Sequence, residues 1–150
     1  MRRRQFITLL GGTAAVWPLA THAQQAQRMR QVGILMAANQ DDAEYQMRIG
    51  VFKQELRKLG WSDRENVRIH ERWSADNMNQ IRGDAANLLG LNPDVIMVEG
   101  RRAVAVLQQL TSTFPVVFFG AGDPVATGLV TSFARPGGNF TGFTDRKSVV

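Results

Sequence analysis

The sequence predicts an α/β fold, a three-layer open parallel sheet with helices on both faces. Short continuous apolar runs stand at residues 32–36, 95–98 and 116–119, as expected for strands buried on both faces. Between them lie stretches in which apolar residues recur every three or four positions, the period of an amphipathic helix. Strand and helix therefore alternate along the chain, which indicates a parallel sheet wound on both faces.

The first half of the chain supplies two strand–helix units. Residues 32–36 form the first strand, and residues 41–59 form a helix with the apolar stripe Tyr45, Ile49, Phe52, Leu56 and Leu59. Gly60 follows that stripe and fits a C-terminal cap, because glycine adopts positive φ without strain. Residues 67–73 predict an edge strand, and a second helix follows on Met78, Ile81, Ala85 and Leu88.

The second half repeats the pattern. Residues 95–98 form a strand, followed by a helical stripe of Ala103, Leu107 and Leu110, and residues 116–119 form the next strand. Asp123 and Pro124 fit a helix start, with aspartate as N-cap and proline at the first helical position. That helix is expected to run to about residue 134. Turn residues at 135–139 then precede a last strand at 140–144.

Composition excludes several classes of protein. A chain of 150 residues, 44% hydrophobic and 21% charged, has the length and balance of one globular domain. With no cysteine and only two histidines, the sequence offers no disulfide, thiol nucleophile, iron–sulfur ligand, lipid-modified cysteine or His-rich metal site. We therefore expect no metal and no cofactor.

The N-terminus has the pattern of an export signal. Residues 1–23 combine a basic start, an apolar stretch at 6–20 and the small-residue site Thr21-His22-Ala23. The pair Arg3-Arg4 before Gln5 and Phe6 resembles the twin-arginine signal; a general secretory signal is the alternative. Without residues 1–23 the chain has 15 basic and 13 acidic residues, a net charge of +2 instead of +5. We therefore expect a periplasmic protein that binds no nucleic acid and meets the membrane only through the export machinery.

Candidate binding residues follow the strands, because ligands of open α/β sheets bind at the carboxyl ends of the strands. Those ends supply Asn39, Gln40, Gly100, Arg101, Gly122 and Asp123. Each has a structural alternative: Asp123 can cap the helix at Pro124, Arg101 and its neighbour can be a solvated pair with a salt bridge to Glu99, and Asn39 and Gln40 can be loop residues. Trp73, at the end of the edge strand, can stack on a ligand or simply cover that strand.

A family resemblance lies in one long stretch of the sequence. This stretch runs from Pro115-Val116-Val117-Phe118-Phe119 through Gly122-Asp123-Pro124-Val125, Gly128-Leu129-Val130 and Arg135-Pro136-Gly137-Gly138-Asn139 to Thr141-Gly142. It resembles the exported substrate-binding proteins of ABC transporters, in the branch with a type I periplasmic-binding fold. The signal-like start and Glu71-Arg72-Trp73 are also similar to that family, so the resemblance covers nearly the whole chain.

The resemblance implies two similar lobes that close on a small ligand, an amino acid or related organic molecule, and deliver it to a membrane permease without chemistry. Residues 24–150 would then be the N-terminal lobe, a Rossmann-like sheet truncated where the chain crosses to the second lobe. Residues 145–150 do not look like the family's continuation, which favours a truncated copy. The family usually has small hydroxyl residues after Gly100, suited to a ligand carboxylate; here Arg101 and Arg102 stand there, and an arginine could clamp a carboxylate instead.

Enzymatic readings fit less well. The dinucleotide fingerprint needs spaced glycines after the first strand, and the sequence there is Met36-Ala37-Ala38-Asn39-Gln40-Asp41. A hydrolase would need a nucleophile paired with a base, and His70 is the one histidine after residue 23. The sequence therefore predicts a binding protein without catalytic residues. A remnant that binds no ligand, or an interaction-only protein, is the main alternative, and a sensor sharing the fold is a weaker one.

Overall fold

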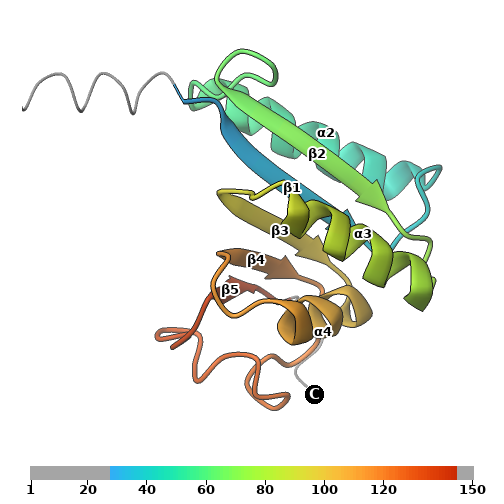
Figure 1. Ribbon diagram of the computed structural model, residues 1–150, viewed down its shortest axis with the longest axis vertical. Helices are drawn as coiled ribbons and strands as arrows, with labels where there is room; N and C mark the ends of the chain where they lie inside the picture. Colours follow the sequence, from blue (N-terminus) through green and yellow to red (C-terminus); the bar gives the residue numbers. More distant parts are fainter. Residues whose placement is uncertain (1–27, 145–150) are drawn as a thin grey trace, which may run out of the picture.

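The computed structural model describes residues 28–144. The predicted signal peptide and the predicted truncation point therefore lie outside the described residues. Five parallel strands form one sheet: β1 (Arg30–Met36), β2 (Val67–Trp73), β3 (Val95–Glu99), β4 (Val116–Phe119) and β5 (Phe140–Phe143). Their order is β2-β1-β3-β4-β5 (Figure 1). The strand order therefore reverses between β1 and β3: β2 lies on one side of β1, and β3, β4 and β5 follow on the other side. The predicted α/β fold is confirmed.

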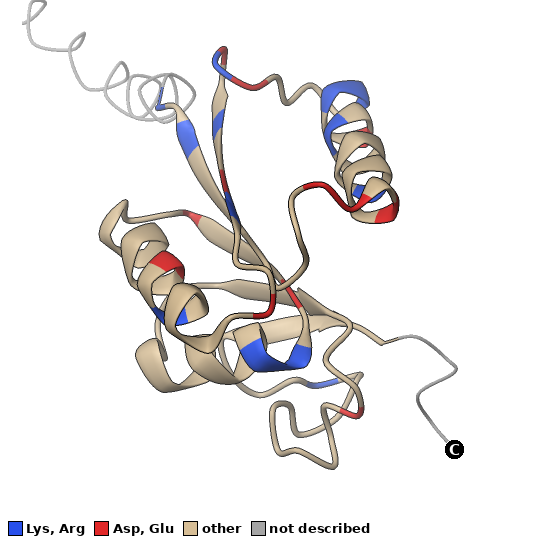
Figure 2. Cartoon of the chain, turned by 90° about the vertical axis from the view of Figure 1, so that its right-hand side faces the viewer, with Lys and Arg blue, Asp and Glu red and all other residues tan. Residues whose placement is uncertain are grey.

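Within residues 28–144, three helices cover the sheet. α2 (Ala43–Lys58) lies on one face, and α3 (Met78–Gly90) and α4 (Arg101–Leu110) lie on the other (Figures 1 and 2). On the α2 side, Ile34 and Met36 of β1 pack with Ile49. On the other side lies the larger core, where Leu35, Val98 and Phe118 of three strands pack against Ile81 and Leu107. The sheet thus has the three layers expected from the sequence.

The helix ends follow from side-chain and glycine chemistry. Asp42 caps α2: its carboxylate accepts from the backbone N–H groups of Glu44 and Tyr45. Acidic residues lie near the start of α2 and basic ones near its end (Figure 2), an arrangement that complements the helix dipole. Gly60, at φ 87°, ends this helix as predicted, and the N–H of the residue after it donates to the carbonyl of Leu56 at 2.9 Å.

The predicted helix from Pro124 to about residue 134 is wrong. Residues 124–128 form turns, and no helix follows within the described part of the connection from β4 to β5. Gly128 adopts φ 70°, a left-handed conformation that stops a helix after its first turn. Leu129 and Val130, which the prediction placed in the helix, instead pack against the larger core. The one correct feature is the cap, because Asp123 accepts from the N–H groups of Val125 and Ala126.

Candidate binding site at the carboxyl edge

The carboxyl ends of β1, β3 and β4 lie side by side. The N–H of Ala37, after β1, donates to the carbonyl of Glu99 at 3.3 Å, and the N–H of Gly100 donates to the carbonyl of Phe119 at 3.3 Å. Backbone hydrogen bonds thus join the three loops that carry the predicted site residues Asn39, Gln40, Gly100, Arg101, Gly122 and Asp123. In open α/β sheets a ligand crevice forms here, where the strand order reverses.

The loop after β1 carries Asn39 and Gln40, both exposed. Their backbone carbonyls are used locally: that of Asn39 accepts from the N–H of Asp42 at 3.2 Å, and that of Gln40 accepts from Nε2 of Gln46 at 2.7 Å. Both residues therefore shape the entry into α2. Their side-chain amides lie at the rim of this edge, where each offers an N–H donor and a carbonyl acceptor to a ligand.

The β3 loop is built on a tight approach to the β1 loop. Gly100 has φ 92° and ψ 138°, and an added Cβ would lie 2.7 Å from the Cβ of Ala37. A side chain at this position would therefore push the two strand ends apart. Gly100 is a structural requirement of the edge as well as a candidate to approach a ligand with its backbone.

The two arginines after Gly100 behave differently. Arg102 binds Asp76, in the loop after β2, with Nη1 to Oδ2 at 2.9 Å. Arg101 is exposed and makes no ion pair with an acid of the described part of the chain. Of the two, Arg101 is therefore the one whose guanidinium stays available. Neither arginine pairs with Glu99, so the alternative of a salt bridge there is wrong.

The β4 loop carries Gly122 and Asp123, both half-buried. Gly122 has φ 78°, which favours glycine. Asp123 uses Oδ1 to accept from the N–H groups of Val125 and Ala126, both at 3.0 Å. The cap accounts for this residue type, as the structural alternative expected, while its other carboxylate oxygen makes no hydrogen bond within residues 28–144.

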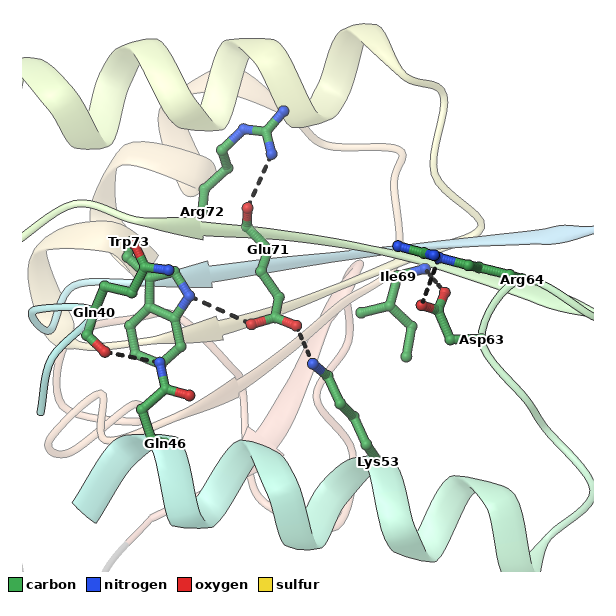
Figure 3. Close-up of polar contacts among 9 residues, drawn as sticks. All are labelled: Gln40, Gln46, Lys53, Asp63, Arg64, Ile69, Glu71, Arg72 and Trp73. Atoms are coloured by element: carbon green, nitrogen blue, oxygen red, sulfur yellow. Dashed lines mark hydrogen bonds and ion pairs between the residues drawn. The ribbon is translucent and has the colours of Figure 1, made fainter. Parts of the chain in front are cut away.

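Trp73, at the end of edge strand β2, is held in place from two sides. Its Nε1–H donates to Glu71 at 3.3 Å, and Glu71 also pairs with Lys53 of α2; Figure 3 shows Glu71 between these two side chains. The indole packs with the α2-side core. Trp73 therefore covers the edge strand and fixes it against α2.

Sequence reasoning missed Glu99 as a site residue. It is the last residue of β3 and is 8% exposed. Oε1 accepts from the hydroxyl of Tyr45 at 3.2 Å. Burial raises the pKa of Glu99, and the hydrogen bond from Tyr45 opposes that shift. The signal available in the sequence was a carboxylate closing an otherwise apolar strand, directly before a glycine.

No three His, Cys, Asp or Glu side chains between residues 28 and 144 gather as a metal site would require. Within the same range, none of the helices has the length and apolar character to cross a membrane. What the edge can do chemically is bind: it presents amides, one available guanidinium, backbone N–H groups and a buried carboxylate.

Known proteins share this fold. A conserved domain protein from Vibrio cholerae matches with a TM-score of 0.70 and 26% identity, over 79% of this chain and 39% of that one. A substrate binding protein with adhesive properties from Clostridium difficile, in its open, ligand-free form, matches with a TM-score of 0.69 and 26% identity, over 78% and 39%. A domain from Streptococcus pneumoniae in complex with L-Trp matches with a TM-score of 0.69 and 23% identity, over 79% and 39%.

Sequence comparison agrees with the structural one. The tyrosine-binding protein of Clostridioides difficile is 26% identical over 98 residues, which are 65% of this chain and 28% of that protein. The chain thus spans well under half the length of the relatives it matches. The family described as ABC transporter substrate binding protein matches residues 31–150. Its members are substrate-binding proteins and not enzymes, in line with the absence of predicted catalytic residues. The chain therefore belongs to the ABC transporter substrate-binding protein family.

Proposed function

We propose that this chain is the solute-binding component of an ABC importer, capturing an amino acid or related small organic molecule in the periplasm. The observation that carries the proposal is the joined carboxyl edge of β1, β3 and β4, where all six predicted site residues lie on connected loops. Family membership supports it. So do the relatives, one a tyrosine-binding protein and one seen with L-Trp.

Residues 24–150 act, in this proposal, as the N-terminal lobe of the receptor, with an ABC permease as the partner that accepts the solute. A single lobe covers one side of a ligand, whereas tight small-molecule sites bury about 70–90% of the ligand surface. Losing half the contacts costs several kcal/mol, and each 1.4 kcal/mol is about tenfold in affinity. We therefore expect this chain alone to bind aromatic amino acids at millimolar rather than micromolar concentrations.

The test is an NMR titration of the ¹⁵N-labelled chain with L-tyrosine and L-tryptophan. Amide shifts confined to the loops after β1, β3 and β4, and weakened by Arg101→Ala, would support the proposal. Arg135→Ala, at an exposed arginine between β4 and β5, is the matched control and should bind like the wild type. Absence of any shift at these loops at millimolar ligand would contradict the proposal and favour a remnant that binds no solute.

Export is proposed to proceed by the twin-arginine route, through the signal in residues 1–23 with cleavage after Ala23. Replacing Arg3 and Arg4 together by lysine should then abolish the mature protein in the periplasmic fraction. A periplasmic yield equal to that of the wild type would show that the general secretory route is used instead.

A further inference from the structure

Glu99 stands apart from every other charged side chain in the described structure. Within residues 28–144 it is the one ionisable side chain classed as buried, at 8% exposed. It ends β3, a central strand, beside Met36 of β1 and Phe119 of β4 in the sheet register. It therefore lies at the reversal of strand order, at the centre of the edge described above.

Within residues 28–144 no cation forms an ion pair with this carboxylate, although the charge of Arg48 and a backbone hydrogen bond from Ala37 favour its charged form. Its one side-chain hydrogen bond comes from the neutral hydroxyl of Tyr45, at 3.2 Å. Arg48, which lies over the Tyr45 ring at 5.3 Å, is paired with Glu44. Arg102, three residues along the chain, is paired with Asp76. A buried carboxylate without an ion-pair partner is costly in its charged form, and burial is the largest influence on the pKa of Glu99.

On the β4 side the carboxylate of Glu99 is bordered by a glycine. Gly120, in the β4 loop, is exposed and has φ 67°. An added Cβ there would lie 3.2 Å from Oε1 of Glu99. Any other residue at this position would therefore crowd the carboxylate from the β4 side. As a glycine, residue 120 itself places no side-chain atom against Glu99.

We propose that Glu99 receives a cationic group of the solute, a primary ammonium, and that this lobe selects its ligand by positive charge at the end of β3. The proposal rests on the proposed function and names the substrate class of the same site. An ammonium at Glu99 would supply the missing opposite charge through a charge-assisted hydrogen bond. A ligand carboxylate at the same point would meet a like charge, so any carboxylate of the solute lies nearer Arg101.

The competing explanation is structural: the hydrogen bond from Tyr45 would simply fasten α2 to β3. That role predicts a loss of stability when either residue is changed, with no effect on which ligand charge is preferred. Charge preference is therefore the readout that separates the two explanations.

The experiment compares three phenols: L-tyrosine, tyramine, which keeps only the amine, and 3-(4-hydroxyphenyl)propionate, which keeps only the carboxylate. Affinities for the full chain come from NMR titration at neutral pH. The wild type should bind tyramine at least about tenfold more tightly than the propionate. Glu99→Gln should lose about tenfold for tyramine and should not lose affinity for the propionate. Glu65→Gln, an exposed change before β2, should match the wild type with all three.

A second measurement uses the wild type alone and does not depend on a folded variant. The charged groups around Glu99 are Arg48 and Glu44 on α2, Asp76 after β2, and Arg101 and Arg102 on α4. Because Glu99 alone among the groups at the edge carries a raised carboxyl pKa, tyramine affinity should fall as the pH is lowered through that pKa, while affinity for the propionate should not.

Two results would overturn the inference. If tyramine binds Glu99→Gln as tightly as the wild type, Glu99 does not receive the amine; L-tyrosine binding at the same loops would then leave the proposed function standing. If the wild type shows no shift with any of the three phenols, the proposed function and the inference fail together.

Discussion

Gly100 and Ala37 approach so closely that a methyl group added to the glycine would lie 2.7 Å from the Cβ of the alanine. This contact brings the end of β3 against the loop that follows β1. It joins the two strands between which the sheet reverses its order, so the spacing of the candidate site depends on a residue without a side chain.

Gly100→Ala should therefore destabilise the protein. The backbone at φ 92° and ψ 138° lies in a region that residues other than glycine adopt only at a cost of about 1–3 kcal/mol, and the contact with Ala37 adds to that cost. Chemical denaturation measures the change. The control is Gly83→Ala in α3, where no atom lies within 4 Å of an added Cβ; it should stabilise by up to about 1 kcal/mol. Equal effects of the two variants would contradict this account.

Asp123→Ala should cost about 1 kcal/mol in the free energy of unfolding, because the carboxylate caps two backbone N–H groups at 3.0 Å. Asp123→Ser keeps an oxygen that can cap and should recover most of that stability. Binding separates the cap from a ligand role: if Asp123→Ser is stable but loses affinity for L-tyrosine, the carboxylate contacts the ligand; if it binds like the wild type, the cap is its whole function.

Asp94 should make stability depend on pH. Its Oδ2 accepts from the backbone N–H of Gln31 at 2.7 Å, and this bond, with help from Arg30, holds the carboxyl pKa below its ordinary value of 3.8. A lowered carboxyl pKa stabilises the folded state above pH 3.8, and that stability is lost as the pH falls through the folded-state pKa.

Asp94→Asn should lower stability at pH 7 by about 1–2 kcal/mol, because it removes a charge-assisted hydrogen bond. It should also flatten the acid limb of a plot of unfolding free energy against pH. Glu65→Gln is the exposed control and should leave the curve unchanged. An acid limb in Asp94→Asn as steep as in the wild type would show that other carboxylates produce it.

Gly142→Ala should detach or distort β5. Gly142 pairs with Phe118 in the sheet register, and an added Cβ would overlap the carbonyl oxygen of Phe118 and lie 2.7 Å from Cγ of its ring. Hydrogen exchange of the β4 and β5 amides should accelerate. Gly138→Ala, four residues earlier in open space, is the control. Unchanged protection of β5 in Gly142→Ala would contradict the expected clash.

Local patterns predicted most of the fold correctly. The apolar runs became strands and the stripes became α2, α3 and α4, because both signals depend on residues close in sequence. The failure came between β4 and β5. There Asp123 and Pro124 supplied a valid helix start, but Gly128 took a left-handed conformation that the apolar residues beyond it did not reveal. Leu129 and Val130 pack in the larger core without forming a helix.

The candidate site was predicted only to the level of loops. Topology alone places the strand ends together, so the six residues could be chosen from order and spacing. The bond between Tyr45 and Glu99 joins positions 54 residues apart, and no local pattern encodes it. The ion pair of Arg102 with Asp76 is likewise a tertiary contact. From sequence, a salt bridge of the arginines to Glu99 was one alternative, whereas the structure shows that Glu99 accepts a hydrogen bond from Tyr45.

The strand order also governs how the chain comes to be folded. Every pairing in the sheet is non-local: Arg30 pairs with Val67, Val32 with Val95, and Val116 with Phe140. Chains dominated by such distant pairings close long loops before they gain stabilising contacts, and they fold slowly for their size. During synthesis β1 emerges first, yet it cannot be flanked on both sides until β3 has been made. For that interval its apolar residues remain available to chaperones and to neighbouring nascent chains, so β1, an inner strand of the native sheet, is exposed longest before it is flanked on both sides.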